Sequence, residues 1–300
     1  MLPDAAHPER GSFVRDQVAA LERLDGLDVE LFEFAPGARA LVRAAADLRK
    51  FQRFDVVHAH FGLTLWPALG VRASLRALTL HGTDVSHPRT RLATLAGLPL
   101  VDVLATVSQP LAEVLPRWAR ARAHVLPCGA DLERFAPIAR EDARRELGLD
   151  SAGPYLLFPA DRARPEKRHD RALELARAAR VELLTLGGVD PGRVPLWVNA
   201  ANAVVVPSER EGFGLAAVEA LACDVPVLAT PVGVHAELLA GVEGTLCAPY
   251  DVLRWGEALA PHLRVHDPRI AGRERARAYS ADAMAERVAR AWRAGRDRGG

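Results

Sequence analysis

Short apolar runs alternate along the chain with stretches whose apolar residues recur at helical spacing. In the first part of the chain, runs of strand length lie at 29–34, 55–60, 76–82, 102–108 and 123–129. Helical spacing is found at 13–24, 38–50 and 110–120. Strands that alternate with helices predict a parallel sheet with helices on its faces.

The alternation stops at a more polar segment, 136–153, which holds one short predicted helix and ends in glycine and proline. It then restarts, with predicted strands at 155–160, 181–188, 203–208 and 226–230 and predicted helices near 168–179 and 214–222. From about 251 onward the spacing is helical. Two such series predict two α/β domains. We expect an N-terminal domain at 1–135, a linker at 136–150, a C-terminal domain at 151–265 and, at 266–300, helices that pack back toward the first domain.

The start of the chain departs from this pattern. A Rossmann-like domain normally opens with a central strand followed by a glycine turn, but "MLPDAAHPERGSF" has the turn without the strand. We therefore expect the first domain to lack its first strand. A gap in mid-sheet would leave backbone groups without partners, which favours an incomplete or misassigned start over a natural design.

Composition narrows the class of protein. The 300 residues include 49% apolar but only 6% aromatic side chains, so the cores should consist mainly of Ala, Leu and Val. The formal net charge is +1, which argues against a dedicated nucleic-acid binder. Nearly all basic residues are arginines, and the lysines are Lys50 and Lys167. A lysine at 167 is therefore an unusual choice in this chain.

Cysteine content and hydropathy point to the cytoplasm. The three cysteines, Cys128, Cys223 and Cys247, have no CxxC spacing, so neither a disulfide framework nor a zinc site is indicated. No apolar run reaches the roughly 18 residues of a membrane span, and no leader pattern opens the chain. We expect a soluble cytoplasmic protein, and peripheral contact with the inner face of a membrane is compatible with this pattern.

The stretch "SEREGFGLAAVEALACDVPVLAT" carries two glutamates, Glu211 and Glu219, with seven residues between them. Gly212 and Gly214 follow the first glutamate, and glycines let backbone N–H groups approach a ligand closely. The N-terminus of the predicted helix near Gly214 favours an anion such as a phosphate. One ligand of sugar-nucleotide size could then meet both acids. Taken alone, the stretch is better explained as a glycine turn that carries two surface glutamates.

The stretch "ADRARPEKRHD" places Arg162 and Lys167 between a predicted strand and a predicted helix. A planar guanidinium and a point-charge ammonium are complementary ligands for phosphoryl oxygens, so the pair predicts a diphosphate clamp. A solvated loop is the plainer interpretation, and we adopt it for Arg164 and Arg168.

Two further segments end predicted strands. In "LHGTDVS", His81 lies beside a glycine at a strand end, and Asp84 is a candidate N-cap of the following turn. A lone histidine in this position is more often structural than catalytic. In "VLPCGADLERFAP", Asp131 follows a predicted strand and a glycine turn. The alternative to a ligand contact is a plain turn that leads into the linker.

Several other chemistries lack their signals. We expect His58 and His60, in "HAHFG", to face opposite sides of a strand and so not to share a metal. The chain has no GxGxxG, which disfavours a nicotinamide oxidoreductase. It also has no Asp-x-Asp, the usual metal–diphosphate clamp of another large class of sugar transferases.

Taken together and in this order, the segments resemble a retaining glycosyltransferase of the GT-B fold, in the large family-four group. "SEREGFGLAAVEALACDVPVLATPVG" resembles its donor signature, "DRARPEK" its Arg-x4-Lys phosphate motif, "HGTD" its histidine loop and "LPCGADLERFAP" its "pnGvDlerF" segment. "HPERGSFVRDQVAAL" and "VPLWVNAANAVVVPS" look most similar to bacterial cell-wall and capsule polysaccharide transferases, such as teichuronic-acid transferases. The resemblance covers nearly the whole chain and implies two Rossmann-like domains that face each other across a cleft.

The resemblance also implies roles for individual residues. Glu211 would hold hydroxyls of the donor sugar, and Glu219 would bind the ribose of the nucleotide. Arg162 and Lys167 would neutralise the diphosphate in place of a metal, and His81 would orient the donor sugar near the reacting carbon. The remaining implied contacts to the donor are made by Gly11, Ser12, Gly212, Phe213, Gly214 and Leu215.

The implied reaction is metal-independent transfer of a sugar, with retention, from an NDP-sugar to a glycan or lipid-linked acceptor in cell-envelope polysaccharide synthesis. No cofactor and no nucleic-acid partner are expected. Asp161 and Arg168 stand where the family usually has glycine, as do Asp224 and Val234, and Asp161 could pair with a nearby cation and weaken the phosphate clamp.

Other functions remain open. A GT-B epimerase would change the sugar without an acceptor. A phosphorylase would carry pyridoxal phosphate on a lysine, which two lysines make a poor match. A catalytically silent or truncated relative would bind nucleotide-sugar or a partner without turnover.

Overall fold

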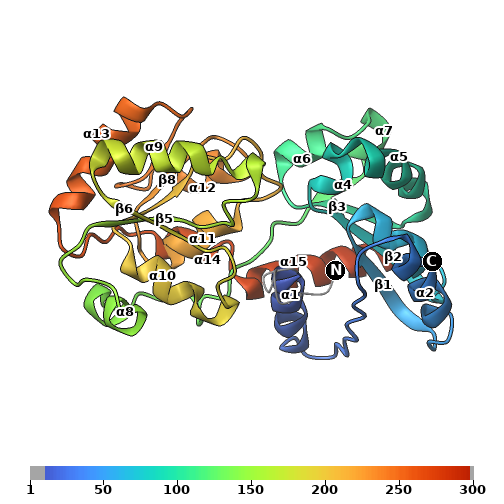
Figure 1. Cartoon of the computed structure of the whole chain (residues 1–300). Coiled ribbons are helices and arrows are strands. Elements are labelled where there is room, and N and C mark those ends of the chain that lie inside the picture. The colour runs from blue at the N-terminus through green and yellow to red at the C-terminus, as the bar shows by residue number, and fades with distance from the viewer. Residues whose placement is uncertain (1–10, 298–300) are drawn as a thin grey trace. The chain divides into compact units, whose positions relative to one another are not determined.

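The computed structural model describes residues 11–297, which form two compact units, each with its own parallel sheet (Figure 1). Unit 1 contains Phe13–Cys128 and residues 282–297. Unit 2 contains Gly129–Ala281 together with Gly11 and Ser12. Two parallel α/β units are the fold class that the alternation predicts, so this prediction is confirmed.

Unit 1 has a four-stranded parallel sheet in the order β1-β2-β3-β4. Its strands are β1 (Phe54–His60), β2 (Ala73–Leu80), β3 (Val103–Thr106) and β4 (Ala123–Val125). Its helices are α1 (Ser12–Glu22), α2 (Ala38–Leu48), α3 (Leu65–Ala68), α4 (Thr83–Ser86), α5 (Pro88–Gly97), α6 (Gln109–Glu113), α7 (Arg117–Arg120) and α15 (Ala281–Asp297), with 3₁₀ turns η1 (Gly62–Thr64) and η2 (Leu98–Leu100). The single helix predicted at 110–120 is instead the pair α6 and α7, divided around Pro116.

Helix α15 packs closely on the sheet of unit 1. A Cβ at Gly295 would lie 2.5 Å from the Val103 side chain of β3 and 2.7 Å from the Leu75 side chain of β2, so the glycine permits this approach. The Trp292 ring meets the His58 ring of β1 edge-on, with 5.6 Å between centroids. Apolar contact of this kind explains why the amphipathic end of the chain forms a 17-residue helix here.

The strand predicted at 29–34 is wrong. This segment belongs to neither described sheet, although Phe32 packs edge-on against Phe51 with 5.7 Å between ring centroids. The Glu33 carboxylate instead accepts hydrogen bonds from the Arg15 guanidinium, the shortest at 2.8 Å. Alternating apolar residues predict a strand only where a neighbour supplies the ladder, and the ladder depends on tertiary structure.

The described strands of unit 1 leave no gap in mid-sheet. Strands β1 to β4 pair continuously, and β1, which pairs with β2, lies at an edge. An edge strand exposes its unpaired backbone groups on one side, so no described strand is interrupted. The residues ahead of the glycine turn, where we expect the first strand to be missing, fall outside the described residues.

Unit 2 has a five-stranded parallel sheet in the order β6-β5-β7-β8-β9. Its strands are β5 (Tyr155–Phe158), β6 (Glu182–Thr185), β7 (Ala203–Val206), β8 (Val227–Ala229) and β9 (Leu246–Cys247). Its helices are α8 (Arg140–Leu147), α9 (His169–Ala179), α10 (Val194–Ala200), α11 (Leu215–Ala222), α12 (His235–Leu239), α13 (Val252–Arg264) and α14 (Arg273–Arg277), with 3₁₀ turns η3 (Pro165–Lys167) and η4 (Pro191–Arg193).

Helices cover both faces of this sheet (Figure 1). Helices α9 and α13 pack together, and Leu175, Trp255 and Leu259 from these helices form a core with Leu156 and Phe158 of β5. On the other side, α8 packs on α10 and α11 packs on α14. Strand β7 reads Ala-Val-Val-Val and is fully buried, which is why its sequence is a continuous apolar run.

Two buried arginines anchor α8. The side chain of Arg144 donates to the carbonyl oxygens of Ala200 and Ser151 and to Oδ1 of Asn202, at 3.0, 2.6 and 2.9 Å. Arg140 donates to the carbonyl oxygen of Ala201 at 2.6 Å. Each of the two arginines is only 1% exposed, so these bonds replace the water that burial removes.

Candidate functional site

The strand order of unit 2 brings two predicted ligand-binding segments together. Strand β5 lies between β6 and β7, so the chain leaves β5 toward one neighbour and later crosses to the other. The loops after β5 and β7 thus leave the same edge of the sheet side by side, at the switch point where α/β folds bind ligands. The backbone links these loops, because the N–H of Glu209 donates to the carbonyl oxygen of Glu166 at 2.9 Å.

A buried ion pair joins the two loops. The Lys167 Nζ lies 2.7 Å from both carboxylate oxygens of Glu211, and the Ser208 hydroxyl donates to Oε1 of Glu211 at 2.7 Å. The two charged side chains are 16% and 8% exposed, so water screens their attraction only weakly. We call Lys167, Ser208 and Glu211 the ion-pair cluster.

The charge of Glu211 is set by this cluster. Burial raises the pKa of the Glu211 carboxyl, but the positive charge and hydrogen bonds of Lys167 outweigh it. His235 and Ser208 add smaller contributions, and the net pKa lies below its ordinary value. Glu211 is therefore a carboxylate at neutral pH, able to accept hydrogen bonds from hydroxyl groups.

The turn that follows Glu211 depends on glycine. Gly214 is the N-cap of α11, with φ 108° and ψ 43°, a conformation that residues with a Cβ rarely adopt. The neighbouring loop closes on this turn: the Val234 N–H donates to the carbonyl oxygen of Phe213 at 2.8 Å. A Cβ at Gly233 would lie 2.2 Å from that same oxygen. The loop at Gly233 and Val234 thus fixes this turn, and α11 begins directly after it, at Leu215.

Sequence reasoning missed His235, which lies behind this turn. Its Nδ1 is 2.9 Å from the carbonyl oxygen of Thr230, which assigns the ring proton to Nδ1. Its Nε2 is buried and has no hydrogen-bond partner within residues 11–297, and it lies 2.3 Å from the position of a Cβ at Gly214. Burial lowers the pKa of His235, and the Glu211 charge only partly offsets this. The flanking sequence is apolar, so no motif marked this residue. Ser208 was also missed, although it stands three positions before Glu211.

Arg162 lies in the loop after β5 with an exposed side chain that makes no ion pair or hydrogen bond within the described residues. The expectation that Asp161 would pair with a nearby cation is wrong. Its Oδ1 accepts from the Ala163 N–H at 2.8 Å, and no ion pair involves Asp161 in the described part of the chain. The carboxylate is used to shape its own turn, which leaves the guanidinium available.

The remaining residues of the two loops fall where the plainer interpretation placed them. Arg164 pairs with Glu166, and Arg168 pairs with Asp170 and Glu209, largely at the surface. Arg168 has φ 57°, which explains why this position favours glycine. Glu219 lies half-buried on α11, in the helix predicted to present it.

Unit 1 holds the second set of candidate residues, around His81. The expectation that His58 and His60 face opposite sides is wrong, because side chains two positions apart on a strand share a face. Their rings stack with 4.6 Å between centroids. The His60 Nδ1 lies 3.0 Å from the His81 Nε2, so the sequence motif "HAHFG" belongs to the surroundings of His81.

His81 is held on several sides. The rings of Phe13 and Phe61 lie 4.8 and 4.7 Å from its ring centroid. Asp84 is not the N-cap of α4, which is Gly82. Instead its buried carboxylate accepts from the backbone N–H groups of His81 and Gly82 at 3.0 and 2.8 Å, fixing the strand end.

Other candidates have structural roles or stay predictions. The Asp131 Oδ1 accepts from the backbone N–H groups of Glu133 and Arg134, as a plain turn would predict. Gly11 has φ 74°, and α1 begins at Ser12, so a glycine turn precedes this helix as predicted. The contact of Gly11 and Ser12 with a donor phosphate stays a prediction.

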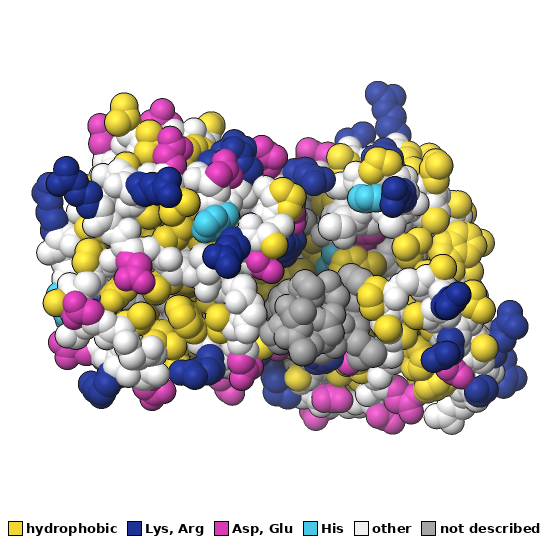
Figure 2. Space-filling model, viewed as in Figure 1, with side chains coloured by type: hydrophobic (Ala, Val, Ile, Leu, Met, Phe, Trp, Pro, Cys, Tyr) yellow, Lys and Arg dark blue, Asp and Glu magenta, His cyan; other side chains and the backbone are white. Residues whose placement is uncertain are grey.

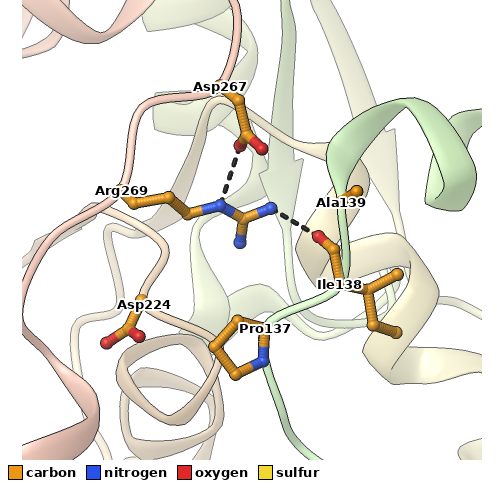
Figure 3. A pocket seen from close by; sticks show the side chains of 6 residues that line it. All are labelled: Pro137, Ile138, Ala139, Asp224, Asp267 and Arg269. Carbon is orange, nitrogen blue, oxygen red and sulfur yellow. Dashed lines mark hydrogen bonds and ion pairs between the residues drawn. The ribbon is translucent and has the colours of Figure 1, made fainter.

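A pocket of unit 2 lies away from these groups. It measures about 200 Å³ and is lined by Pro137, Ile138, Ala139, Asp224, Asp267 and Arg269 (Figure 3). Arg269 lies 2.8 Å from Asp267 and donates to the carbonyl oxygen of Ile138 at 2.6 Å. The Arg269 guanidinium is therefore bound by groups of the protein itself. Asp224 precedes β8, whereas the ion-pair cluster follows β5 and β7. The pocket is therefore at the opposite strand ends from the candidate site.

The surface charges, the metal-ligating side chains and the hydropathy of the helices bear on what the protein can bind. Basic and acidic side chains are intermixed on the face shown in Figure 2. Within residues 11–297, no group of three or more His, Cys, Asp or Glu side chains is placed to hold a metal ion. None of the described helices is both long and apolar enough to cross a membrane.

Comparison with known proteins identifies related chains. A family model described as "Glycosyltransferase Family 4" matches residues 6–134, and one described as "Glycosyl transferases group 1" matches residues 171–279. A D-inositol 3-phosphate glycosyltransferase from Xylanimonas cellulosilytica is 31% identical over 70% of this chain, and the chain spans 64% of that relative's length. One from Mycobacterium avium is 30% identical, over 90% of this chain and 75% of its own length.

Solved structures show the same fold. HepE from Anabaena, in complex with UDP and glucose, has a TM-score of 0.71 and 15% identity and covers 96% of this chain and 97% of its own. Sucrose-phosphate synthase from Thermosynechococcus elongatus has a TM-score of 0.66 and 23% identity. It covers 80% of this chain and 73% of its own chain. These likenesses confirm the GT-B fold. The named relatives above are not teichuronic-acid transferases, so that branch stays a prediction.

Proposed function

We propose that this chain transfers a sugar from a nucleoside-diphosphate sugar to a hydroxyl acceptor. The chain belongs to the glycosyltransferase family of the two models and the relatives named above. The observation that carries this proposal is the ion-pair cluster at the switch point of unit 2. It places an ammonium and a hydrogen-bond-accepting carboxylate at one point, beside the start of a helix. Those are the groups that a sugar phosphate needs.

The donor contacts follow from the chemistry of each group. Arg162 and Lys167 bind the diphosphate. The exposed guanidinium of Arg162, which has no partner among the described residues, is suited to this. The backbone N–H groups of Gly212, Phe213, Gly214 and Leu215 approach the sugar and its phosphate around the start of α11. Glu211 accepts hydrogen bonds from sugar hydroxyls, and Glu219 binds the ribose. Gly11 and Ser12 contact the phosphates.

The reaction proposed is metal-independent and retains the anomeric configuration. As the C–O bond to the nucleotide breaks, negative charge grows on the leaving diphosphate, and Arg162 and Lys167 stabilise it electrostatically. The leaving phosphate accepts the proton of the attacking acceptor hydroxyl on the same face of the sugar. His81 orients the donor sugar, and no side chain acts as nucleophile.

The acceptor is proposed from resemblance and from relatives. The sequence motifs suggest a glycan or lipid-linked acceptor in cell-envelope polysaccharide synthesis, at the inner face of the membrane. The names of the curated relatives suggest a second acceptor, D-inositol 3-phosphate. UDP-sugars are the first donors to try, since HepE structures contain UDP or UDP-glucose.

Calorimetric titration with a panel of UDP-, GDP-, ADP- and TDP-sugars tests the donor site. We expect one donor to bind, and expect Glu211→Gln and Arg162→Met each to weaken it about tenfold or more, because each change removes a charge-assisted hydrogen bond. Arg164→Met is the matched control, since Arg164 lies in the same loop but pairs with Glu166. Absence of donor binding, or equal effects of Arg162→Met and Arg164→Met, would contradict the proposal.

A further inference from the structure

A chain of hydrogen-bonding side chains leads from α1 to His81 in unit 1. The Gln17 Nε2 lies 3.4 Å from the His60 Nε2. The other ring nitrogen of His60, Nδ1, lies 3.0 Å from the His81 Nε2. The Gln17 side chain is on a buried helix position, 7% exposed, so water does not compete strongly with these contacts.

The direction of this chain is fixed by its first member. An amide nitrogen carries two hydrogens and donates only, so the His60 Nε2 must accept. A neutral imidazole that accepts at Nε2 carries its proton at Nδ1. His60 therefore donates from Nδ1 to the His81 Nε2, and His81 in turn carries its proton at Nδ1.

We propose that Gln17, acting through His60, is a positioning residue that holds His81 in the Nδ1–H tautomer. The inference deepens the proposed function and rests on it only for the consequence to turnover. The tautomer itself follows from the described contacts of unit 1.

The surroundings keep all three members of this chain in place. Burial lowers the pKa of His60 to about 4 and lowers the pKa of His81, so both rings are neutral at neutral pH and retain a lone pair. The His58 ring stacks on His60 and is itself held by Thr79 at 2.8 Å. Phe61, which packs against His81, has φ 73°, a strained conformation for a bulky residue that the surrounding structure must hold in place.

The tautomer decides what His81 can do. Its Nε2 lone pair is occupied by the His60 N–H, so His81 has no free basic nitrogen. The Nδ1–H group remains as a hydrogen-bond donor. His81 is thus suited to donate to an oxygen of the donor that gains negative charge, and it is not suited to remove the acceptor proton.

Imidazole ¹⁵N NMR on the full chain measures the tautomer without any substrate. Histidine-labelled protein gives signals for ten histidines, which His60→Asn and His81→Asn assign. In the unaltered protein we expect His81 to be protonated at Nδ1, the opposite of the Nε2–H form that histidine favours in water. Gln17→Met removes the donor at similar volume, so we expect the His81 Nε2 signal to shift toward its protonated position.

The matched control is Gln52→Met, the same change at an exposed position of unit 1, which should leave the His81 signals unmoved. Protonation of His81 at Nε2 in the unaltered protein overturns the inference. So does an unmoved His81 signal in Gln17→Met protein whose circular dichroism shows it folded. If Gln17→Met does not fold, the assignment in the unaltered protein still decides the direction of the chain.

Turnover separates this inference from the proposed function. With a donor that binds, we expect Gln17→Met to lower kcat about tenfold, as loss of an oriented hydrogen-bond donor does, while donor Kd is unchanged. An Nδ1–H tautomer in a protein that neither binds nor consumes any donor would leave the tautomer established and the proposed function refuted.

Discussion

Gly214→Ala tests how closely His235 packs against the turn at Gly214. Backbone strain at φ 108° costs an alanine about 1–3 kcal/mol. The new Cβ would lie 2.3 Å from the Nε2 and 2.7 Å from the Cδ2 of His235, and overpacking of this kind costs about 1–3 kcal/mol. His235 cannot retreat freely, because it is fully buried and bonded to Thr230. Lower chain entropy in the unfolded state returns about 0.4–1 kcal/mol. We therefore expect a net loss of about 1–5.6 kcal/mol.

Urea denaturation followed by tryptophan fluorescence measures this free energy, with Gly241→Ala as the matched control. Gly241 also has positive φ, 72°, but a Cβ there meets nothing within 4 Å, so its cost should be the strain less the same entropy return, about 0–2.6 kcal/mol. In a double-mutant cycle, His235→Ala should relieve about 1–3 kcal/mol of the Gly214→Ala loss. Equal losses at Gly214 and Gly241, or no relief, would refute the reasoning.

Three further predictions follow from the same contacts. Lys167→Met leaves Glu211 buried without its partner, so we expect about 3–5 kcal/mol of destabilisation in urea, against almost none for the exposed-pair control Lys50→Met. Mild acid should destabilise the protein. The pKa of His60 is lowered from 6.5 to about 4, so on acidification the unfolded chain binds this proton before the folded chain does. We expect the free energy of unfolding to fall by about 2 kcal/mol between pH 7 and pH 5, measured by denaturation at several pH values. His60→Asn should flatten that decline, and an equally steep decline would contradict it. EDTA should leave nucleotide release unchanged, because cationic side chains take the metal's role; loss that Mg²⁺ restores would disprove this.

The alternation of apolar runs predicted strands β5, β6, β7 and β8 of unit 2, because buried parallel strands such as β7 have continuous apolar sequences. It missed β9, which has only two residues. It failed at 29–34, where the residues have strand character but none of the described strands pairs with them. Helix α10 was also missed, since its seven residues are too few for a helical period to stand out.

The candidate site was predictable as a set of motifs but not as a set of contacts. Glu211 and Lys167 were each marked by local sequence, yet their ion pair depends on the crossover that places β7 beside β5. The His60 contact with His81 likewise depends on the pairing of β1 with β2, which aligns His60 with Thr79. No local pattern carries such information. His235 had no sequence signal at all, because a buried histidine looks like any other residue of an apolar stretch.

The central claim is that this chain consumes a nucleotide-sugar by transfer with retention. The most direct test is to follow the anomeric proton signal of the bound donor by NMR, in EDTA, with and without an acceptor panel that includes D-inositol 3-phosphate, a lipid-linked sugar and glycans. We expect metal-independent nucleotide release and a product of the same anomeric configuration, lost in Glu211→Gln. Donor that binds but is never consumed would contradict the account and identify a silent relative. A changed sugar without acceptor would identify an epimerase, and an inverted product would refute the proposed reaction.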